Sequence, residues 1–301
     1  MTINDCIFRF HNYYSGYCAQ STIDYYDITL HLFSRYLILR GCDLNDDIAL
    51  LPDTVLQDYV SYLRKLGTIK NTSIRTYIRG VKVFFNYLRK TRIVDIDYTL
   101  FLQTPRLDAS VIMPLTGKQV NNLLSKIDNL RNVLIFRLML DCGLRVSEVC
   151  NLDYDDINFD GKYIVVRNSK YNKSRVVPLP GIVRELIKQY YKWELIPFAE
   201  NPLVRSRTGG RLTPNAIKQM FYKLKKYHPA IHCHLLRHTF ATSFILGGGS
   251  LEILRVLMGH SDYNVTRNYL HISSQLKIID YDIYQLDGCM FKDYILYNKK
   301  E

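Results

Sequence analysis

Apolar residues recur every three or four positions in three segments of the first hundred residues. The segments cover residues 21–37, 52–67 and 71–88. This spacing matches one face of an α-helix, and Ser21 and Pro52 are residue types that suit a helix start. The N-terminal part of the chain is therefore predicted to consist of helices joined by short polar turns.

The periodicity breaks between residues 104 and 114, where two prolines and small polar residues intervene. Helical spacing then returns, and it predicts helices over 117–127, 130–141, 182–196, 213–227, 235–246, 250–258 and 263–272. Short strands are predicted over 156–159, 162–167 and 175–179. The expected fold is mainly α with a small antiparallel β-sheet. Its parts are a helical domain (1–106), a linker (107–113), a mixed α/β domain (114–286) and a tail (287–301).

The distribution of charge along the chain indicates a class of binding partner. The formal net charge is +12, and much of it lies in three stretches without acidic residues: 59–94, 201–251 and 162–184. Because these stretches belong to both predicted domains, they favour a nucleic acid partner over an acidic membrane surface. The candidate DNA contacts are Arg75, Arg79 and Lys82, which share a face of the third helix, and Lys173 and Arg175 near the predicted strands.

Several protein classes are excluded by what the sequence lacks. It has no apolar stretch of the roughly 18 residues that a membrane span needs, and no secretory signal pattern. Its seven cysteines form no CxxC pair, and the His232–His234 run lacks a second ligand pair, so we expect neither a disulfide framework nor a bound metal. Nucleotide-binding glycine motifs are also missing, so no cofactor is expected. The expected location is the cytoplasm, in association with the nucleoid.

Four motifs in the predicted mixed α/β domain contain closely spaced basic, acidic and histidine residues. GLRVSE (143–148) places a carboxylate three residues after an arginine, and the predicted loop 168–175 is rich in basic residues. HLLRH (234–238) has a histidine and an arginine one turn apart, and MGHSD (258–262) precedes a predicted helix that contains Tyr269. Each motif alone has an ordinary structural explanation, such as a surface ion pair or a charged hairpin tip.

Together, and in this order, the motifs resemble those of the tyrosine recombinase (phage integrase, Xer-like) family, over roughly residues 110–275. The resemblance implies an active site of six residues: Arg145, Lys170, His234, Arg237, His260 and Tyr269. Two guanidinium groups suit the non-bridging oxygens of a phosphodiester, and a phenol with a pKa of about 10 needs a base to become a nucleophile. The implied roles are Tyr269 as nucleophile, His234 as base and Lys170 as general acid. His260 would bond the phosphate, and Glu148 would orient Arg145 or a neighbouring histidine.

The resemblance also implies a reaction. DNA strands would be cut and rejoined through a covalent 3'-phosphotyrosyl link, which conserves the ester and needs neither metal nor ATP. Strand exchange would take place between paired half-sites of duplex DNA in a tetramer, with the tail 287–301 docked on a neighbouring subunit. Integration, excision, inversion and resolution are all compatible with the sequence. The alternatives are a type IB topoisomerase-like relaxation of DNA and a catalytically silent DNA-binding protein.

Overall fold

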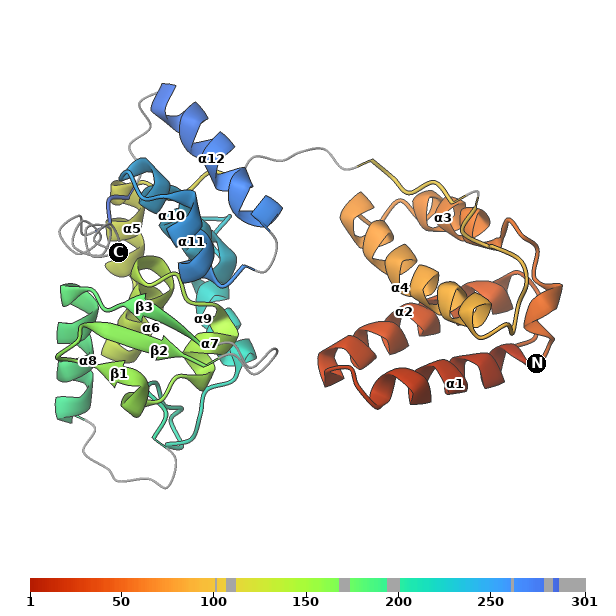
Figure 1. Cartoon of the computed structure of the whole chain (residues 1–301), viewed down its shortest axis with the longest axis horizontal. Coiled ribbons are helices and arrows are strands. Elements are labelled where there is room, and N and C mark those ends of the chain that lie inside the picture. The colour runs from red at the N-terminus through yellow and green to blue at the C-terminus, as the bar shows by residue number, and fades with distance from the viewer. Residues whose placement is uncertain are drawn as a thin grey trace. The chain divides into compact units, whose positions relative to one another are not determined.

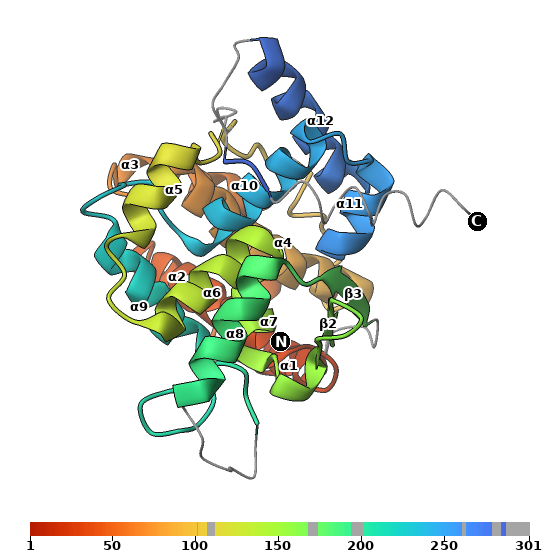
Figure 2. The same cartoon turned by 90° about the vertical axis from the view of Figure 1, so that its left-hand side faces the viewer.

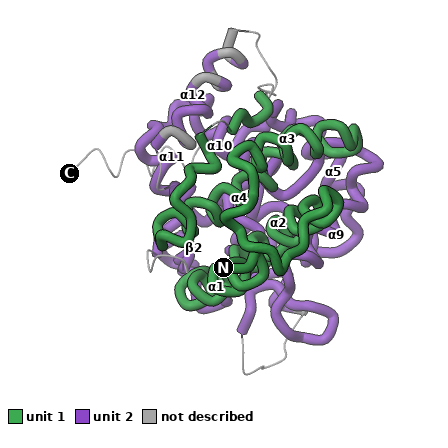
Figure 3. The backbone as a smooth tube through the Cα atoms, turned by 90° about the vertical axis from the view of Figure 1, so that its right-hand side faces the viewer, with its two compact units in different colours: residues 1–110 green, residues 111–301 purple. Residues whose placement is uncertain are grey.

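The computed structural model describes most of the chain and divides it into two compact units, residues 1–110 and 111–301 (Figure 3). The described residues are 1–100, 102–106, 112–167, 174–193, 201–260, 263–278 and 284–286. The predicted basic loop with Lys170 and Lys173, and the predicted tail 287–301, lie outside these residues.

Unit 1 is a helical bundle around an aromatic core. Its helices are α1 (Ile3–Ser15), α2 (Gln20–Leu39), α3 (Val55–Lys65) and α4 (Asn71–Lys90), with a short 3-10 turn at Ile48–Leu50. The segment of α1 was not predicted, because its buried face consists of only Ile3, Cys6 and Phe10 among polar and exposed aromatic residues. The predicted start at Ser21 is also wrong, since α2 begins at Gln20 without a side-chain cap.

Helices α2 and α4 approach each other closely at one glycine. A Cβ atom at position 80 would lie 2.8 Å from the Cβ of Thr29, so only glycine lets the two backbones come this near. The apolar face of α4 is buried in this bundle, whereas Arg79 and Lys82 are exposed and Arg75 is half-buried. The three basic residues that the sequence places on one face therefore lie on the solvent side of the helix.

Unit 2 contains a small antiparallel sheet of order β1-β2-β3, shown in Figure 1. The strands are β1 (Ile157–Asn158), β2 (Tyr163–Val166) and β3 (Arg175–Pro178). The helices packed with the sheet in one hydrophobic core are α5 (Gly117–Leu124), α6 (Leu130–Asp141), α7 (Val146–Asn151), α8 (Gly181–Trp193) and α9 (Pro214–Leu224). Figure 2 shows α8 alongside α6. The predicted fold class, mainly α with a small antiparallel sheet, is confirmed.

The remaining helices form a second layer of unit 2, in the upper part of Figure 1. They are α10 (Cys233–Leu246), α11 (Leu251–Met258) and α12 (Tyr263–Ile278). Most of α10 is buried, and α11 and α12 both pack against it. The helix predicted over 263–272 continues to Ile278. Within the described residues, no helix has the length and hydropathy of a membrane span.

Candidate active site

The GLRVSE motif forms a tight turn followed by the short helix α7. Gly143 has a φ of 64°, and a Cβ there would lie 2.5 Å from Cδ1 of the Phe240 ring, so glycine is required on both counts. The turn leaves Arg145 as the residue that precedes α7, where its amide donates to Glu148 Oε2 at 2.7 Å. Arg145 Nη1 also donates to Glu148 Oε1 at 2.8 Å. The spacing of three residues thus brings Glu148 onto Arg145, as the sequence predicts.

Glu148 is a buried carboxylate that contacts three arginines. Arg175 Nη1 and Nη2 donate to its two oxygens at 2.8 Å each, and Arg237 Nη1 lies 3.9 Å from Oε2. Burial opposes ionisation of Glu148, but its bonds with Arg175 and the Arg145 amide lower its pKa to about 2. The carboxylate is therefore charged at neutral pH. We call Arg145, Arg175, Arg237 and Glu148 the arginine cluster.

The end of α11 supplies the other partners of the cluster. Gly259 adopts the left-handed conformation that commonly ends a helix, with a φ of 58°. Three successive carbonyl oxygens at this turn each accept from one arginine: Leu257 from Arg175 Nε at 2.7 Å, Met258 from Arg237, and Gly259 from Arg145 Nη2 at 3.1 Å. Carbonyls at the C-terminal end of a helix carry partial negative charge, so they offset part of the positive charge of the cluster.

Arg237 is the most deeply buried member of the cluster, with 4% of its surface exposed. It donates to the carbonyls of Gly143 and Met258, which join the GLRVSE turn to the end of α11. Burial and the neighbouring charge of Arg145 lower its pKa to about 9, which leaves the guanidinium charged at neutral pH. Its position is therefore fixed from two sides.

His260 follows the same turn and lies between Arg237 and α12. Arg237 Nη2 lies 3.3 Å from His260 Nε2, and His260 Nδ1 lies 3.0 Å from the hydroxyl of Thr266. Since a guanidinium can only donate, Nε2 is the accepting nitrogen and the ring proton is on Nδ1, facing Thr266. Burial, followed by the charges of Arg237 and Arg145, lowers the pKa of His260 to about 4, so the ring is neutral at pH 7.

Tyr269 lies on α12 beside two imidazole rings. Its ring centroid is 5.3 Å from that of His238 and 6.4 Å from that of His260, which is nearly parallel to it. Burial raises the pKa of the Tyr269 phenol, and the charges of Arg237 and Arg145 oppose that rise. The phenol is therefore protonated at rest and lies within the field of the arginine cluster.

His234 is exposed at the first turn of α10. Partial burial lowers its pKa below the ordinary value, and the charges of His232 and Arg237 lower it further. A neutral imidazole in this position can accept a proton. It lines a cavity of about 450 Å³ together with Val146 of α7 and Lys218 and Tyr222 of α9.

One expectation from the sequence needs correction. Arg175 was predicted to contact DNA, but it is 9% exposed and each of its three nitrogens donates to a protein oxygen. It supports Glu148 instead of forming part of the surface. Its position in β3, in step with the buried Val177, is the signal that could have shown this. Glu148 was expected to orient Arg145 or a neighbouring histidine, and it is bonded to Arg145 and also to Arg175.

Sequence reasoning missed the role of Thr266 and the hydrogen-bond partner of His238. Thr266 is fully buried and holds the His260 ring, whereas His238 Nε2 bonds the carbonyl of Ile112 at 2.7 Å. The His238 contact joins residues 126 positions apart, and the Thr266 contact joins His260 to a residue six positions further on, beyond the MGHSD motif, so neither was predicted.

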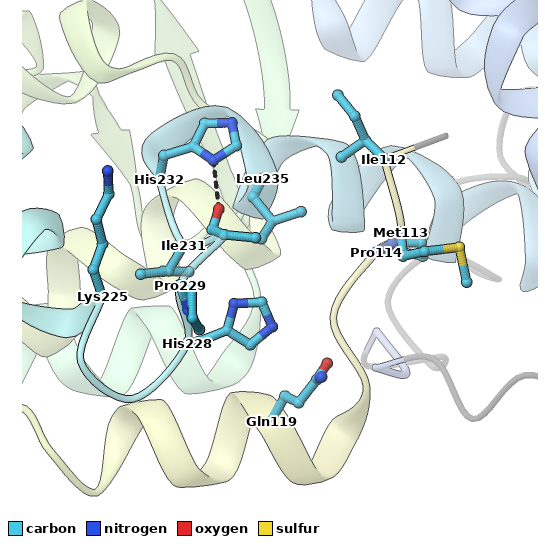
Figure 4. A pocket seen from close by; sticks show the side chains of 11 residues that line it. Ile112, Met113, Pro114, Gln119, Lys225, His228, Pro229, Ile231, His232 and Leu235 are labelled. Atoms are coloured by element: carbon cyan, nitrogen blue, oxygen red, sulfur yellow. Dashed lines mark hydrogen bonds between the residues drawn. The ribbon is translucent and has the colours of Figure 1, made fainter. Parts of the chain in front are cut away.

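A second open pocket has a volume of about 470 Å³ (Figure 4). It is lined by Ile112 and Pro114 on one side and by Lys225, His228 and His232 on the other. None of the predicted catalytic residues that the structure describes contributes to it. Within the described part of the chain, no group of three or more His, Cys, Asp or Glu residues could hold a metal ion.

Comparison with known proteins places this site in a family. The model of the phage integrase family matches residues 114–275, more than half of the chain. A tyrosine recombinase of Pseudothermotoga lettingae is 31% identical over 253 residues, covering 81% of this chain and 85% of that protein. Tyrosine recombinase XerC of Agrobacterium fabrum is 28% identical over 281 residues, covering 88% of each chain.

A solved structure shows the same fold. The Tn1549 transposon integrase in complex with transposon right end DNA superposes with a TM-score of 0.72 at 21% identity, covering 93% of this chain and 99% of that one. The resemblance inferred from the motifs is thereby confirmed. The chain belongs to the phage integrase family and is a tyrosine recombinase, an enzyme of site-specific DNA recombination.

Proposed function

We propose that Arg145, Arg237, His260 and Tyr269 bind and attack a DNA phosphodiester, with His234 as the base and Lys170 as the acid. The observation that carries this proposal is the arginine cluster, in which Glu148 and three helix-end carbonyls hold the guanidinium groups beside Tyr269. The main requirement of phosphoryl transfer is to stabilise the negative charge that develops in the transition state. Donors that are already fixed do this without reorganisation.

The charge of the cluster fits this chemistry. Three guanidinium groups and one carboxylate carry a net charge of +2. A phosphodiester carries one negative charge, and attack by an oxyanion adds a second in the five-coordinate transition state. The surplus positive charge therefore matches the transition state better than the ground state, and differential stabilisation of this kind accelerates a reaction.

Strand cleavage would proceed by one displacement at phosphorus. The phenol oxygen of Tyr269 forms a bond to phosphorus while its proton passes to His234. The bond to the 5'-oxygen breaks, and Lys170 gives that oxygen a proton. The products are a 3'-phosphotyrosyl link and a free 5'-hydroxyl, and attack by a 5'-hydroxyl of another strand reverses the step.

Phosphate binding would also change the role of His260. Its Nε2 accepts from Arg237 in the free site. A non-bridging phosphate oxygen that takes over this N–H of Arg237 would free Nε2, and the negative charge would raise the pKa of the ring. His260 could then donate to the phosphate, with Thr266 accepting from Nδ1.

The DNA partner is supported by charge and by the related integrase, which was solved with DNA. The exposed Arg79 and Lys82 of α4, together with Arg75, would contact phosphates on the duplex. Lys173 would contribute from the loop beside Lys170. Recombination of paired half-sites would require four copies of the chain, with residues 287–301 of one copy docking on the next.

The test is to trap the covalent intermediate. Cells that express the protein are lysed in denaturant, protein-bound DNA is purified, and the attached strand is sequenced to define the site. We expect adducts at one recurring sequence, and none for Tyr269→Phe, which removes only the phenol oxygen. Adducts spread evenly over the genome would favour a topoisomerase-like activity, and adducts that persist in Tyr269→Phe would assign the nucleophile to another residue.

A further inference from the structure

The chain returns to the body of unit 2 after α12 and is held there by hydrogen bonds at residue 284. The backbone N–H of Tyr284 donates to the carbonyl of Leu115 at 2.9 Å, and its carbonyl accepts from the Ser243 hydroxyl at 2.6 Å. Leu115 is itself bonded to α10, because its N–H donates to the Thr239 hydroxyl at 2.9 Å. The backbone at Tyr284 is therefore attached to the segment that precedes α5 and to α10.

The side chain of Tyr284 is held by two charged residues of α6. Its hydroxyl donates to Asp141 Oδ1 at 2.7 Å and accepts from Arg137 Nη1 at 2.8 Å. Arg137 and Asp141 also pair with each other at 3.3 Å, and their side chains are only 13% and 6% exposed. Burial and the charge of Asp141 hold the pKa of Tyr284 well above its usual range, so the hydroxyl remains a donor. Hydrogen bonds to charged groups in buried surroundings are strong and directional.

These contacts bracket the helix that carries the nucleophile. The start of α12 is fixed by Thr266, which bonds His260. Beyond its end, Tyr284 is fixed to α6 and α10, and Leu286 packs against the same apolar cluster of α10 and α11 as Tyr269. Tyr269 lies between the two attachments. We call the contacts of Tyr284 with Arg137, Asp141, Ser243 and Leu115 the Tyr284 clamp.

We propose that Tyr284 is a positioning residue that holds Tyr269 against the arginine cluster of its own chain. The inference rests on the proposed role of Tyr269 as nucleophile. Because residue 284 is bonded to α6 and α10, and Leu286 packs on the same apolar cluster as Tyr269, the clamp restricts movement of α12 away from its own α10. This restriction favours attack by the phenol on the phosphate bound by the same subunit. Any exchange between subunits is then confined to residues beyond 286.

A role in stability alone accounts less well for the hydroxyl at position 284 and its two charged partners. An apolar side chain at position 284 would fill the same space, and replacing buried charged networks by apolar groups is often neutral or stabilising. The hydrogen bonds of the hydroxyl with two charged partners fix the orientation of Tyr284. A helix that carries a nucleophile needs such a fixed orientation.

The first experiment tests the clamp without any DNA. Amide hydrogen exchange is compared between the full-length wild type and Tyr284→Phe, which keeps the ring and removes the hydroxyl. We expect exchange in α12 to rise about tenfold, with α8 unchanged, because the two hydrogen bonds of the hydroxyl with charged groups are lost. Tyr191→Phe is the matched control, since it removes a half-buried hydroxyl bonded to the Pro202 carbonyl at 3.2 Å. Unchanged exchange in α12 would overturn the proposal.

The second experiment measures the covalent step with a nicked oligonucleotide that carries the sequence recovered from the trapped adducts. We expect Tyr284→Phe to form the adduct about tenfold more slowly with the same affinity for the oligonucleotide, and Tyr191→Phe to match the wild type. A wild-type rate in Tyr284→Phe overturns the proposal. The proposal is also overturned if the rate falls by the same factor as the affinity and the melting temperature falls as well, which would indicate a folding role alone. If Tyr284→Phe does not fold, Ser243→Ala, which removes only the bond to the Tyr284 carbonyl, takes its place.

The third experiment asks which subunit supplies the phenol. Tyr269→Phe, which keeps the arginine cluster, is mixed with Arg145→Ala, which keeps the phenol. We expect no more adduct from the mixture than from either variant alone, whereas adduct at the wild-type rate would show delivery between subunits and overturn the proposal. If the wild type itself forms no adduct, the proposed function fails, and the exchange experiment still decides whether the clamp holds α12.

Discussion

The α4 surface and the arginine cluster carry positive charge in opposite ways. On α4, Arg79 and Lys82 are exposed, and within the described residues neither forms an ion pair. In the cluster, Arg175 and Arg237 are buried, both donate to carbonyls at the end of α11, and Arg175 also donates to Glu148. The first arrangement leaves long side chains free to adapt to a polyanion, whereas the second fixes the position of each guanidinium group.

The difference follows from what each region has to do. Contacts with the DNA backbone contribute affinity and register, and they tolerate some movement of the side chain. Stabilising a transition state requires donors already at their final positions, because reorganisation during the reaction costs free energy. Burying charge is expensive, so the cluster contains its own carboxylate and helix-end carbonyls as compensation. Substitutions in the two regions should therefore affect DNA affinity and the covalent step separately.

The largest effect is expected for Arg237→Lys. Lysine keeps the charge but cannot donate to the Gly143 and Met258 carbonyls while also facing a phosphate. We expect adduct formation to fall about a thousandfold, with affinity for the oligonucleotide unchanged. Arg255→Lys, at a half-buried arginine of α11 paired with the exposed Glu252, is the matched control and should be neutral. A small effect of Arg237→Lys would mean that charge alone suffices in the cluster.

Glu148 should make the stability of unit 2 depend on acid. Its pKa is about 2 in the folded chain, against an ordinary value of 4.5. A lowered pKa stabilises the fold above pH 4.5, and that stabilisation disappears as the pH falls through 2. We expect Glu148→Gln to lower the free energy of unfolding by about 3 kcal/mol at pH 7, and this difference to vanish towards pH 2.

Urea unfolding curves of the wild type and Glu148→Gln between pH 7 and pH 2 would measure the effect. Glu252→Gln, which alters an exposed ion pair, should show almost no difference at any pH. A constant gap between wild type and Glu148→Gln across the range would refute a role for the ionised carboxylate in holding the cluster together.

The contrast between the two regions also explains what the sequence could predict. Basic residues three or four apart on a long amphipathic helix reveal a charged face, so the exposed side of α4 was found. The pair Arg145 and Glu148 was found because both lie within one turn. The carbonyls of residues 257–259 have no side-chain signature, and their partners come from three distant segments, so the compensation of the cluster could not be predicted.

Short or weakly patterned elements were missed for a related reason. Helix α7 has six residues, too few for a periodicity to show, and α1 buries only three. Arg175 was assigned to the surface from its charge, although its register in β3 points inward with Val177. The role of Lys170 remains a prediction, because its loop lies outside the described residues.

Arg175→Lys tests whether Arg175 belongs with the buried charge or with the charge that contacts DNA, because this residue was expected at the DNA surface and lies inside the arginine cluster. Lysine cannot donate to both Glu148 oxygens and the Leu257 carbonyl in the same geometry. We expect adduct formation to fall about tenfold to a hundredfold, with no change in affinity for DNA or in its salt dependence. If affinity and its salt dependence decrease instead, Arg175 contacts phosphate and the comparison breaks down.

The smallest effect is expected for Arg79→Ala on the exposed face of α4. Removing one phosphate contact should weaken binding to every DNA sequence by a similar factor of about three to ten. The slope of log affinity against log salt should fall by about one. The rate of the covalent step at saturating DNA should stay the same, because an adaptable contact contributes equally to ground state and transition state. Arg40→Ala, an exposed arginine at the end of α2, serves as the matched control in filter-binding titrations at several salt concentrations. A lower covalent rate at saturation would show that α4 helps to position the phosphate, so that adaptable and fixed charge are not divided between the two regions.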